Sequence, residues 1–320
     1  MKKSIALLLG TLLVGFILGC PVTIESGQAQ SKTNDPDTAV NGSGISHKPS
    51  KPMIIWYSRR WGWGLHEPLR LVTSSGFFSH VMLMGLHKYD IPTYAANPKY
   101  LKAFNLCKKN DVKVIWARPL YPNHKLRRFT VQDAFDAEYY VQQIREVRKE
   151  ARKMKVDLVA FDAEMCCDCP LVPFKHRNLS EAEFGRLKRA ISTAIQVAGK
   201  VDFILPARTS LGRHIYDATS SLGKLIITEH TYYDIPWTHS KEMEKKRPYD
   251  IFGAYVGLTK KNKDHPNLPL FTPREILERQ YLWIHKKGLF IYPGGDPGGV
   301  ALEFSRIRNI RPSLEKRDGD

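Results

Sequence analysis

The chain has 320 residues, a hydrophobic fraction of 42% and a formal net charge of +17 at pH 7. That hydrophobic fraction is ordinary for a globular core and excludes a largely disordered chain. The positive charge would suit nucleic acid, anionic envelope polymers or lipid head groups equally well. Because no nucleic-acid-binding motif is evident and the lysines and arginines are scattered as on solvated faces, we expect no nucleic acid partner.

The first twenty residues have the layout of a secretory signal. In "MKKSIALLLGTLLVGFILGC", two lysines precede an apolar run that is too short and too early for a membrane span. The closing "ILGC" resembles the lipobox of bacterial lipoproteins, in which Cys20 becomes the lipidated first residue of the mature chain. An uncleaved anchor helix and cleavage after Ala29 are the alternatives. The resemblance implies an exported lipoprotein, membrane-anchored through its lipid at the outer membrane, in the periplasm or on the cell surface.

Composition divides the rest of the chain. After the signal peptide (1–19), residues 20–51 are rich in Ser, Gly, Thr, Asn and Asp and have almost no large apolar side chains. Such a segment cannot bury enough surface to order itself, so we expect a flexible linker. Residues 52–311 have the length of one large domain, and 312–320 form a polar tail.

From residue 52 onward, apolar runs rich in β-branched and aromatic residues alternate with amphipathic stretches. Helices are predicted over 131–154, 181–198 and 273–287. Strands are predicted over 53–58, 79–86, 112–120, 157–164, 201–207, 224–230, 250–258 and 288–295. Eight such units in about 250 residues predict an α/β protein with a (β/α)8 TIM barrel. A doubly wound open sheet is the alternative, but no glycine-rich phosphate turn follows the first strand.

The fourth predicted strand ends in two acids, within "VDLVAFDAEMCCDCP" (156–170). Strand side chains alternate between faces, so Val159 and Phe161 share one face, and the other carries Leu158, Ala160, Asp162 and Glu164. The carboxyl ends of barrel strands form the catalytic mouth, where the two acids would meet a substrate. The alternative is that both acids form salt bridges with arginines at the barrel rim.

Several strands resemble those of the family 18 glycoside hydrolases, the chitinase-like barrels. The fourth strand of that family carries Asp-Gly-x-Asp-x-Asp-x-Glu, which "DLVAFDAE" matches at Asp157, Asp162 and Glu164. "IIWYSRRWGW", "FFSHVMLM" and "EHTYYD" resemble the first, second and sixth strands of the family, in the right order, and supply Tyr57, His80, Tyr233 and Asp234.

The sequence departs from the family at several positions. Leu158 replaces the glycine of the fourth strand and Ala160 replaces its middle aspartate. The third strand, "VIWARPLYP", lacks the Ser-x-Gly-Gly of the family, and Tyr292 in the eighth strand stands where tryptophan is usual. The chain therefore resembles a distant relative, not a standard chitinase.

The resemblance implies a substrate-assisted hydrolysis of N-acetylglucosamine-containing glycans that needs no cofactor. Glu164 would be the acid/base, Asp162 would orient the substrate's acetamido group and Tyr233 would hydrogen-bond its carbonyl. Substrate-binding residues would be Asp234, Glu229, Tyr57, Trp116 and Tyr292. The partner implied is thus a polysaccharide or oligosaccharide.

Two other readings of the same residues remain open. Glu229 shares its strand face with Tyr233, so Glu164 and Glu229 could form the acid/base and nucleophile of a two-carboxylate retaining glycosidase. The missing middle aspartate equally fits a barrel that binds carbohydrate without cleaving it. The sequence makes no prediction of oligomeric state.

Three cysteines in one loop suggest either a disulfide or a metal site. Cys166, Cys167 and Cys169 occupy one loop after the fourth strand, and His176 follows. In an exported protein a local disulfide is the default, while a metal site with these four ligands, supporting metal-assisted hydrolysis, is the alternative. Cys107 is expected to be a buried small hydrophobe. The glycine-rich "YPGGDPGG" (292–299) is expected to be a barrel loop.

Overall fold

The computed structural model describes residues 53–58, 66–84, 98–121, 129–156, 158–163, 170–171, 179–205, 217–227, 250–259, 270–284 and 288–307. All of them belong to the unit Pro49–Asp320. The predicted signal peptide, linker and polar tail lie outside the described residues.

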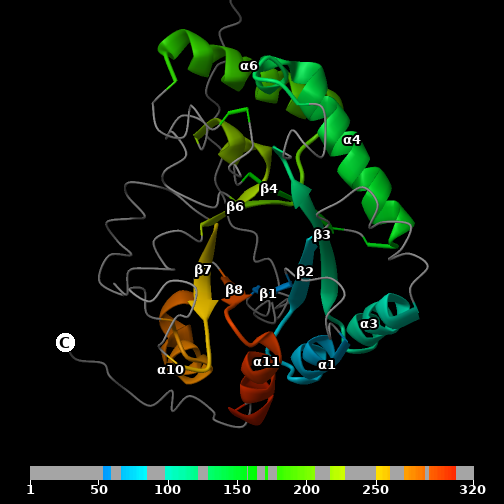
Figure 1. Ribbon diagram of the computed structural model, residues 1–320, viewed down its shortest axis with the longest axis vertical. Coiled ribbons are helices and arrows are strands. Elements are labelled where there is room, and N and C mark those ends of the chain that lie inside the picture. Colours follow the sequence, from blue (N-terminus) through cyan, green and yellow to red (C-terminus); the bar gives the residue numbers. More distant parts are fainter. Residues whose placement is uncertain are drawn as a thin grey trace, which may run out of the picture. The chain divides into compact units, whose positions relative to one another are not determined.

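Eight parallel strands form a closed barrel in which sequence neighbours pair with one another and β8 pairs with β1 (Figure 1). The predicted TIM barrel is confirmed, and the open doubly wound sheet is excluded. The strands are β1 (Ile54–Ser58), β2 (His80–Met84), β3 (Lys113–Pro119), β4 (Leu158–Asp162), β5 (Phe203–Leu205), β6 (Lys224–Ile227), β7 (Ile251–Val256) and β8 (Leu289–Pro293).

Helices connect the strands along the outside of the barrel (Figure 1). They are α1 (His66–Ser74), α3 (Pro98–Lys109), α4 (Ala137–Lys153), α6 (Glu181–Ala198), α10 (Pro273–Ile284) and α11 (Pro297–Arg306), with short 3₁₀ turns η1 (Asp133–Phe135) and η2 (Ser220–Leu222). Helix α6 has the predicted bounds, because Ser180 and Glu183 form a reciprocal capping box at its start. Within the described part of the chain, no helix is long and apolar enough to cross a membrane.

Two predicted boundaries are wrong for the same physical reason. The helix expected from residue 131 begins instead at Ala137, because the Asp136 side chain accepts a hydrogen bond from the Glu138 amide and so caps α4 there. The loop expected over 292–299 ends early, because Pro297 opens α11 after the Asp296 cap. In both cases a local side-chain cap decides where the helix starts.

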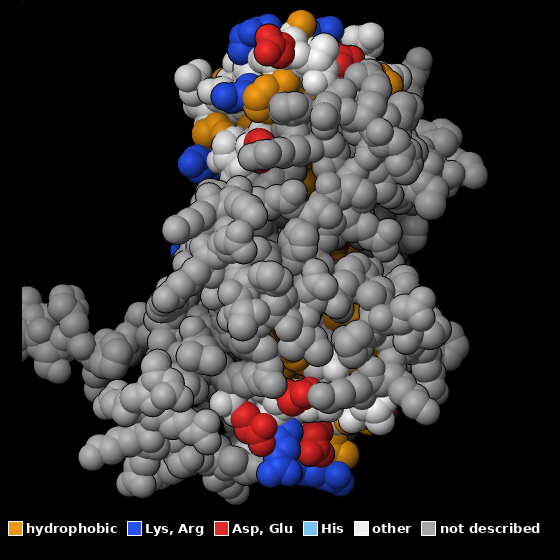
Figure 2. All heavy atoms as spheres, turned by 90° about the vertical axis from the view of Figure 1, so that its left-hand side faces the viewer, with side chains coloured by type: hydrophobic (Ala, Val, Ile, Leu, Met, Phe, Trp, Pro, Cys, Tyr) orange, Lys and Arg blue, Asp and Glu red, His pale blue; other side chains and the backbone are white. Residues whose placement is uncertain are grey.

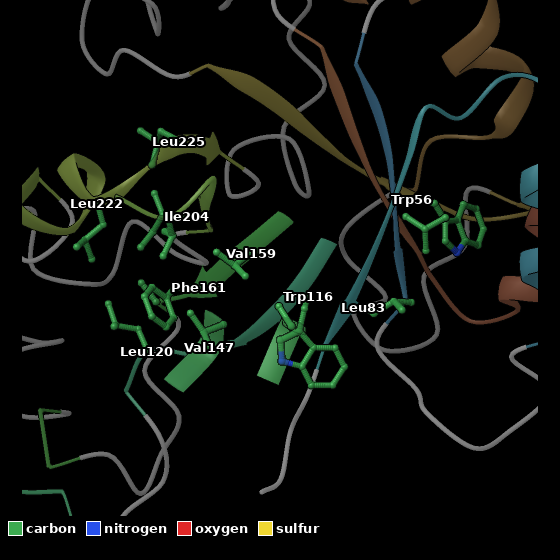
Figure 3. Packing of buried hydrophobic residues seen from close by; sticks show 14 of the residues in the cluster. Trp56, Leu83, Trp116, Leu120, Val147, Val159, Phe161, Ile204, Leu222 and Leu225 are labelled. Carbon is green, nitrogen blue, oxygen red and sulfur yellow. The ribbon is translucent and has the colours of Figure 1, made fainter. Parts of the chain in front are cut away.

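Two apolar layers hold the barrel together. One lies between the sheet and the helices, and Figure 3 shows part of it, including Trp56, Trp116 and Phe161. The other fills the barrel interior with Ile55, Tyr57, Met82, Met84, Ile115, Ala117, Ala160, Phe203, Leu205, Ile226, Ile251 and Phe290. The alternation predicted for the fourth strand is confirmed up to Phe161, since Val159 and Phe161 lie in the outer layer while Leu158 and Ala160 face inward.

Polar side chains close the amino-terminal end of the barrel. The Asp202 carboxylate, just before β5, accepts a hydrogen bond from the Val159 amide of β4 at 2.8 Å. The Asp250 carboxylate, just before β7, accepts one from the Leu225 amide of β6 at 2.7 Å. Each acid thus satisfies an amide that the preceding strand would otherwise leave unpaired. The polar groups at this end therefore serve stability, as is usual for this end of a TIM barrel.

Candidate functional site

Asp162 is the last residue of β4 and lies at the carboxyl-terminal end of the barrel. Leu158 and Ala160 face the barrel interior, and because side chains alternate along a strand, Asp162 is assigned to the same face. The residue is half-buried. Its backbone is held from both sides. The Leu120 amide donates to the Asp162 carbonyl at 2.7 Å, and the next residue of the chain, Ala163, donates to β5. The carboxylate is therefore carried by a fixed backbone at the end where barrel enzymes place their chemistry.

The interior beneath Asp162 is lined by small side chains. Ala117 of β3 and Ala160 of β4 are register partners, and both are fully buried in the interior layer. Ala160 occupies the position at which the resemblance implies a second aspartate. The layer below Asp162 on this side is therefore apolar.

Three tyrosines occupy the same end of the barrel. Tyr57, Tyr255 and Tyr292 come from β1, β7 and β8, which are neighbouring strands. The rings of Tyr57 and Tyr292 are stacked with centroids 5.1 Å apart, and Tyr255 meets Tyr292 edge-on at 5.0 Å. Tyr57 and Tyr255 are buried and Tyr292 is half-buried. These three residues, hereafter the tyrosine cluster, form a packed aromatic wall in which Tyr292 keeps part of its surface exposed.

Gly294 lets the tyrosine cluster close. A Cβ atom at this position would lie 2.7 Å from the Tyr255 ring, closer than any side chain tolerates. Glycine is therefore required for the backbone after β8 to pass over that ring. Tyr57 and Tyr292 were expected from the sequence, whereas Tyr255 was missed. The signal was available, because Tyr255 alternates with Gly253 and Ile251, of which Ile251 faces the interior.

Strand order relates Asp162 to the tyrosine cluster. β4 is four strands away from β8 in the eight-stranded ring, so the acid and the aromatic wall lie on opposite sides of the barrel. Both are at the carboxyl ends of their strands. A carboxylate opposite an aromatic surface is an arrangement that suits a sugar ring, which offers hydroxyls at its edge and C–H groups on its face.

Trp116 does not belong to this site, which corrects the sequence-based expectation. Its side chain lies in the outer layer and is fully buried, and its indole N–H donates to Glu150 of α4 at 3.0 Å. Arg118, two residues on, also points outward and forms ion pairs with Glu146 and Glu150 at 3.0 and 3.1 Å. The arginine at this point of the rim is thus paired on the outside of the barrel.

The remaining expected site residues lie outside the described residues, and their roles stay predictions. They are Cys20, Asp157, Glu164, Cys166, Cys167, Cys169, His176, Glu229, Tyr233 and Asp234. Ala163 belongs to the outer layer, so the alternation holds up to the residue directly before Glu164.

His80 is the buried histidine of the opposite, amino-terminal end. It opens β2, is 8% exposed, and its Nδ1 lies 2.8 Å from the Ser79 hydroxyl. Burial, with the nearby positive charges of Lys113 and Lys224, lowers its pKa to about 4. The imidazole is therefore neutral at pH 7 and far from Asp162, which points to a structural role.

Metal chemistry gains no support from the described ranges, in which no group of three His, Cys, Asp or Glu side chains could hold an ion. The expectation for Cys107 is confirmed, since its thiol is buried and burial raises its pKa to about 12. Such a thiol is inert at neutral pH.

No protein-family model matches the chain, and no curated protein does. Solved structures share its fold. A class V chitinase from Nicotiana tobaccum is 9% identical over 81% of this chain and 99% of that one, with a TM-score of 0.48. A family 18 chitinase from Cycas revoluta in complex with (GlcNAc)4 is 9% identical over 80% and 99%, with a TM-score of 0.48. A sugar phosphate isomerase/epimerase from Parabacteroides distasonis is 10% identical over 82% and 95%, with a TM-score of 0.44. Similarities at this level report the barrel fold alone.

Proposed function

We propose that this protein is a glycoside hydrolase of the chitinase-like type that cleaves N-acetylglucosamine-containing glycans. The observation that carries the proposal is that Asp162 is the last residue of β4, two residues after Ala160, which faces the barrel interior. This is the position to which the sequence resemblance assigns the residue that orients the acetamido group. The confirmed alternation of β4 also supports an inward-facing Glu164.

The proposed reaction uses the substrate as its own nucleophile. Glu164 donates a proton to the glycosidic oxygen while the acetamido oxygen forms a bond to the anomeric carbon, so the leaving sugar departs as an alcohol. Asp162 orients the acetamido group and stabilises the positive charge that develops on it, and Tyr233 hydrogen-bonds the carbonyl. Glu164, now a base, takes a proton from a water molecule that attacks the anomeric carbon. This attack breaks the bond between the anomeric carbon and the acetamido oxygen and restores the acetamido group.

The tyrosine cluster supplies the sugar-binding surface in this proposal. Tyr292 is half-buried, and the rings of Tyr57 and Tyr255 contact its ring from two directions. A ring fixed in this way loses little conformational entropy when a sugar face stacks on it. Tyr292 thus takes the place of the tryptophan that is usual in the family.

One observation favours a second candidate, a barrel that binds carbohydrate without hydrolysing it. Ala160 faces the interior where the family has its middle aspartate, so Asp162 has no carboxylate directly beneath it on β4. A sugar could still stack on the tyrosine cluster in such a protein. Binding without turnover would then be the whole activity.

Turnover of an N-acetylglucosamine tetramer, followed by chromatography of the products, tests the proposal. Glu164→Gln should lower kcat by about 10²–10⁴-fold, the usual contribution of a general acid/base, and leave binding measured by calorimetry nearly unchanged. Glu181→Gln is the matched control, because Glu181 is exposed in the first turn of α6. Binding by the wild type without turnover would favour the second candidate. Absence of both would refute the two together.

A further inference from the structure

Exposed positive charge gathers at the amino-terminal end of the barrel, around the starts of β3 to β6. Parallel strands begin at this end, and the antiparallel helices that precede them end there. Eight exposed cations lie in the last turns of α3 and α4, in the segments that follow α4 and α6, and at the first residues of β3 and β6. They are here called the basic face: Lys108, Lys109, Lys113, Arg152, Lys153, Lys155, Lys200 and Lys224.

Among the described residues, acids are fewer than cations at the basic face. Against these eight cations, the described segments that enter β3 to β7 hold four acids, Asp111, Asp202, Asp217 and Asp250. Asp202 and Asp250 already accept hydrogen bonds from strand amides. None of the eight cations has an ion-pair partner among the described side chains. The face therefore presents positive charge to solvent.

Other described surfaces differ from the basic face. In Figure 2, where described side chains reach the surface at the top and bottom of the view, Lys and Arg lie beside Asp and Glu. Arg274 of α10, for example, pairs with Glu278 one turn on at 2.9 Å. Where these other described side chains are visible, charges of both signs thus lie together.

The upstream chain joins the barrel at this same end. β1 begins at Ile54, and its start lies beside the starts of β2 and β8. Met53, the first described residue of the chain, therefore lies at the end that carries the basic face, and the predicted lipid on Cys20 is upstream of it in the sequence. A lipid tether of this kind and a cationic surface are the two signals that together give stable membrane attachment.

We propose that the basic face docks on the anionic lipid head groups of the membrane. Lysine is suited to this role, because it is a strongly hydrated point charge that interacts with many head groups without a fixed geometry. The carboxyl-terminal end, with Asp162 and the tyrosine cluster, would then face away from the bilayer. The inference does not depend on the reaction proposed above.

Vesicle partition of the full chain tests this docking. We expect stronger binding to phosphatidylcholine vesicles that contain about one third phosphatidylglycerol than to pure phosphatidylcholine, and a fall in that preference as salt is raised. In the triple variant Lys109→Gln, Lys153→Gln and Lys200→Gln, the preference for anionic vesicles should drop by about 100-fold, at about fivefold for each lysine. Binding to the neutral vesicles, which the apolar amino-terminal segment can provide, should not change.

The matched control removes the same charge elsewhere. Lys102→Gln, Arg186→Gln and Lys188→Gln change exposed residues in the first halves of α3 and α6, away from the strand starts. This variant should keep most of the preference. The proposal is overturned if the wild type has no preference for anionic vesicles, if both variants lose it equally, or if soluble polyphosphate binds the face while anionic vesicles do not.

Discussion

Acidification should destabilise the fold through His80, and the structure fixes the sign of the effect. The imidazole is 8% exposed, and Lys113 and Lys224 lie close enough to oppose a further positive charge. Its pKa is lowered from 6.5 to about 4, chiefly because burial disfavours the charged form. The unfolded chain therefore takes up this proton at a higher pH than the folded protein does.

The size of the effect follows from proton linkage. Stability is fully present above about pH 6.5 and is lost as the pH falls towards 4, because the unfolded state binds more protons in this window. A difference of this size between the two pKa values corresponds to a loss of about 3 kcal/mol. Burial is the main cause, so added salt should reduce the loss only slightly.

Urea unfolding at several pH values between 7 and 4 measures the effect, with His80→Asn as the comparison. The asparagine amide keeps a polar partner for the Ser79 hydroxyl, which lies 2.8 Å from Nδ1, but has no proton to gain in this range. The carboxylates titrate alike in both proteins, so the difference between the two curves isolates the histidine. If wild type and His80→Asn lose the same free energy of unfolding down to pH 4, the reasoning is refuted.

Three further outcomes can be measured. Glu150→Ala should lower the free energy of unfolding in urea by about 1–3 kcal/mol, because it removes the acceptor of the buried Trp116 indole and one of the two carboxylates that pair with Arg118, and Glu150→Gln should lower it less. Gly294→Ala should displace Tyr255 and weaken binding of the N-acetylglucosamine tetramer, measured by calorimetry. Gly298→Ala should not, because its added Cβ would lie 3.5 Å from the nearest atom, Oδ1 of Asp296. Cys107 should stay unmodified by a thiol reagent in peptide mapping until the protein unfolds.

The sequence predicts the barrel well because strands and helices alternate strictly along the chain. It also predicts which face of β4 points inward, because acidic residues occur on only one of its two faces. β3 has no polar residue that distinguishes its faces in this way. Both faces of a parallel barrel strand are apolar, so nothing in "VIWARP" distinguishes the inward Ile115 and Ala117 from the outward Trp116. An aromatic residue near the mouth was therefore wrongly expected in the site.

Helix starts and tertiary partners are harder to read from sequence. The start of α11 follows two residues that favour turns, and the Asp296 side chain overrides them with a single hydrogen bond of 2.9 Å to Gly299. The tyrosine cluster depends on three strands that are neighbours only because the barrel closes between β8 and β1. That closure is a property of the whole fold and not of any one segment.

Turnover of the N-acetylglucosamine tetramer by Asp162→Asn is the most direct measurement of the central claim, that β4 delivers a working carboxylate to the mouth of the barrel. Asp111→Asn makes the same chemical change at the opposite end, at an exposed residue whose φ of 55° asparagine tolerates. We expect kcat to fall by about 100-fold or more in Asp162→Asn and to stay at the wild-type value in Asp111→Asn, with both proteins folded. Equal turnover in Asp162→Asn and wild type would contradict the claim.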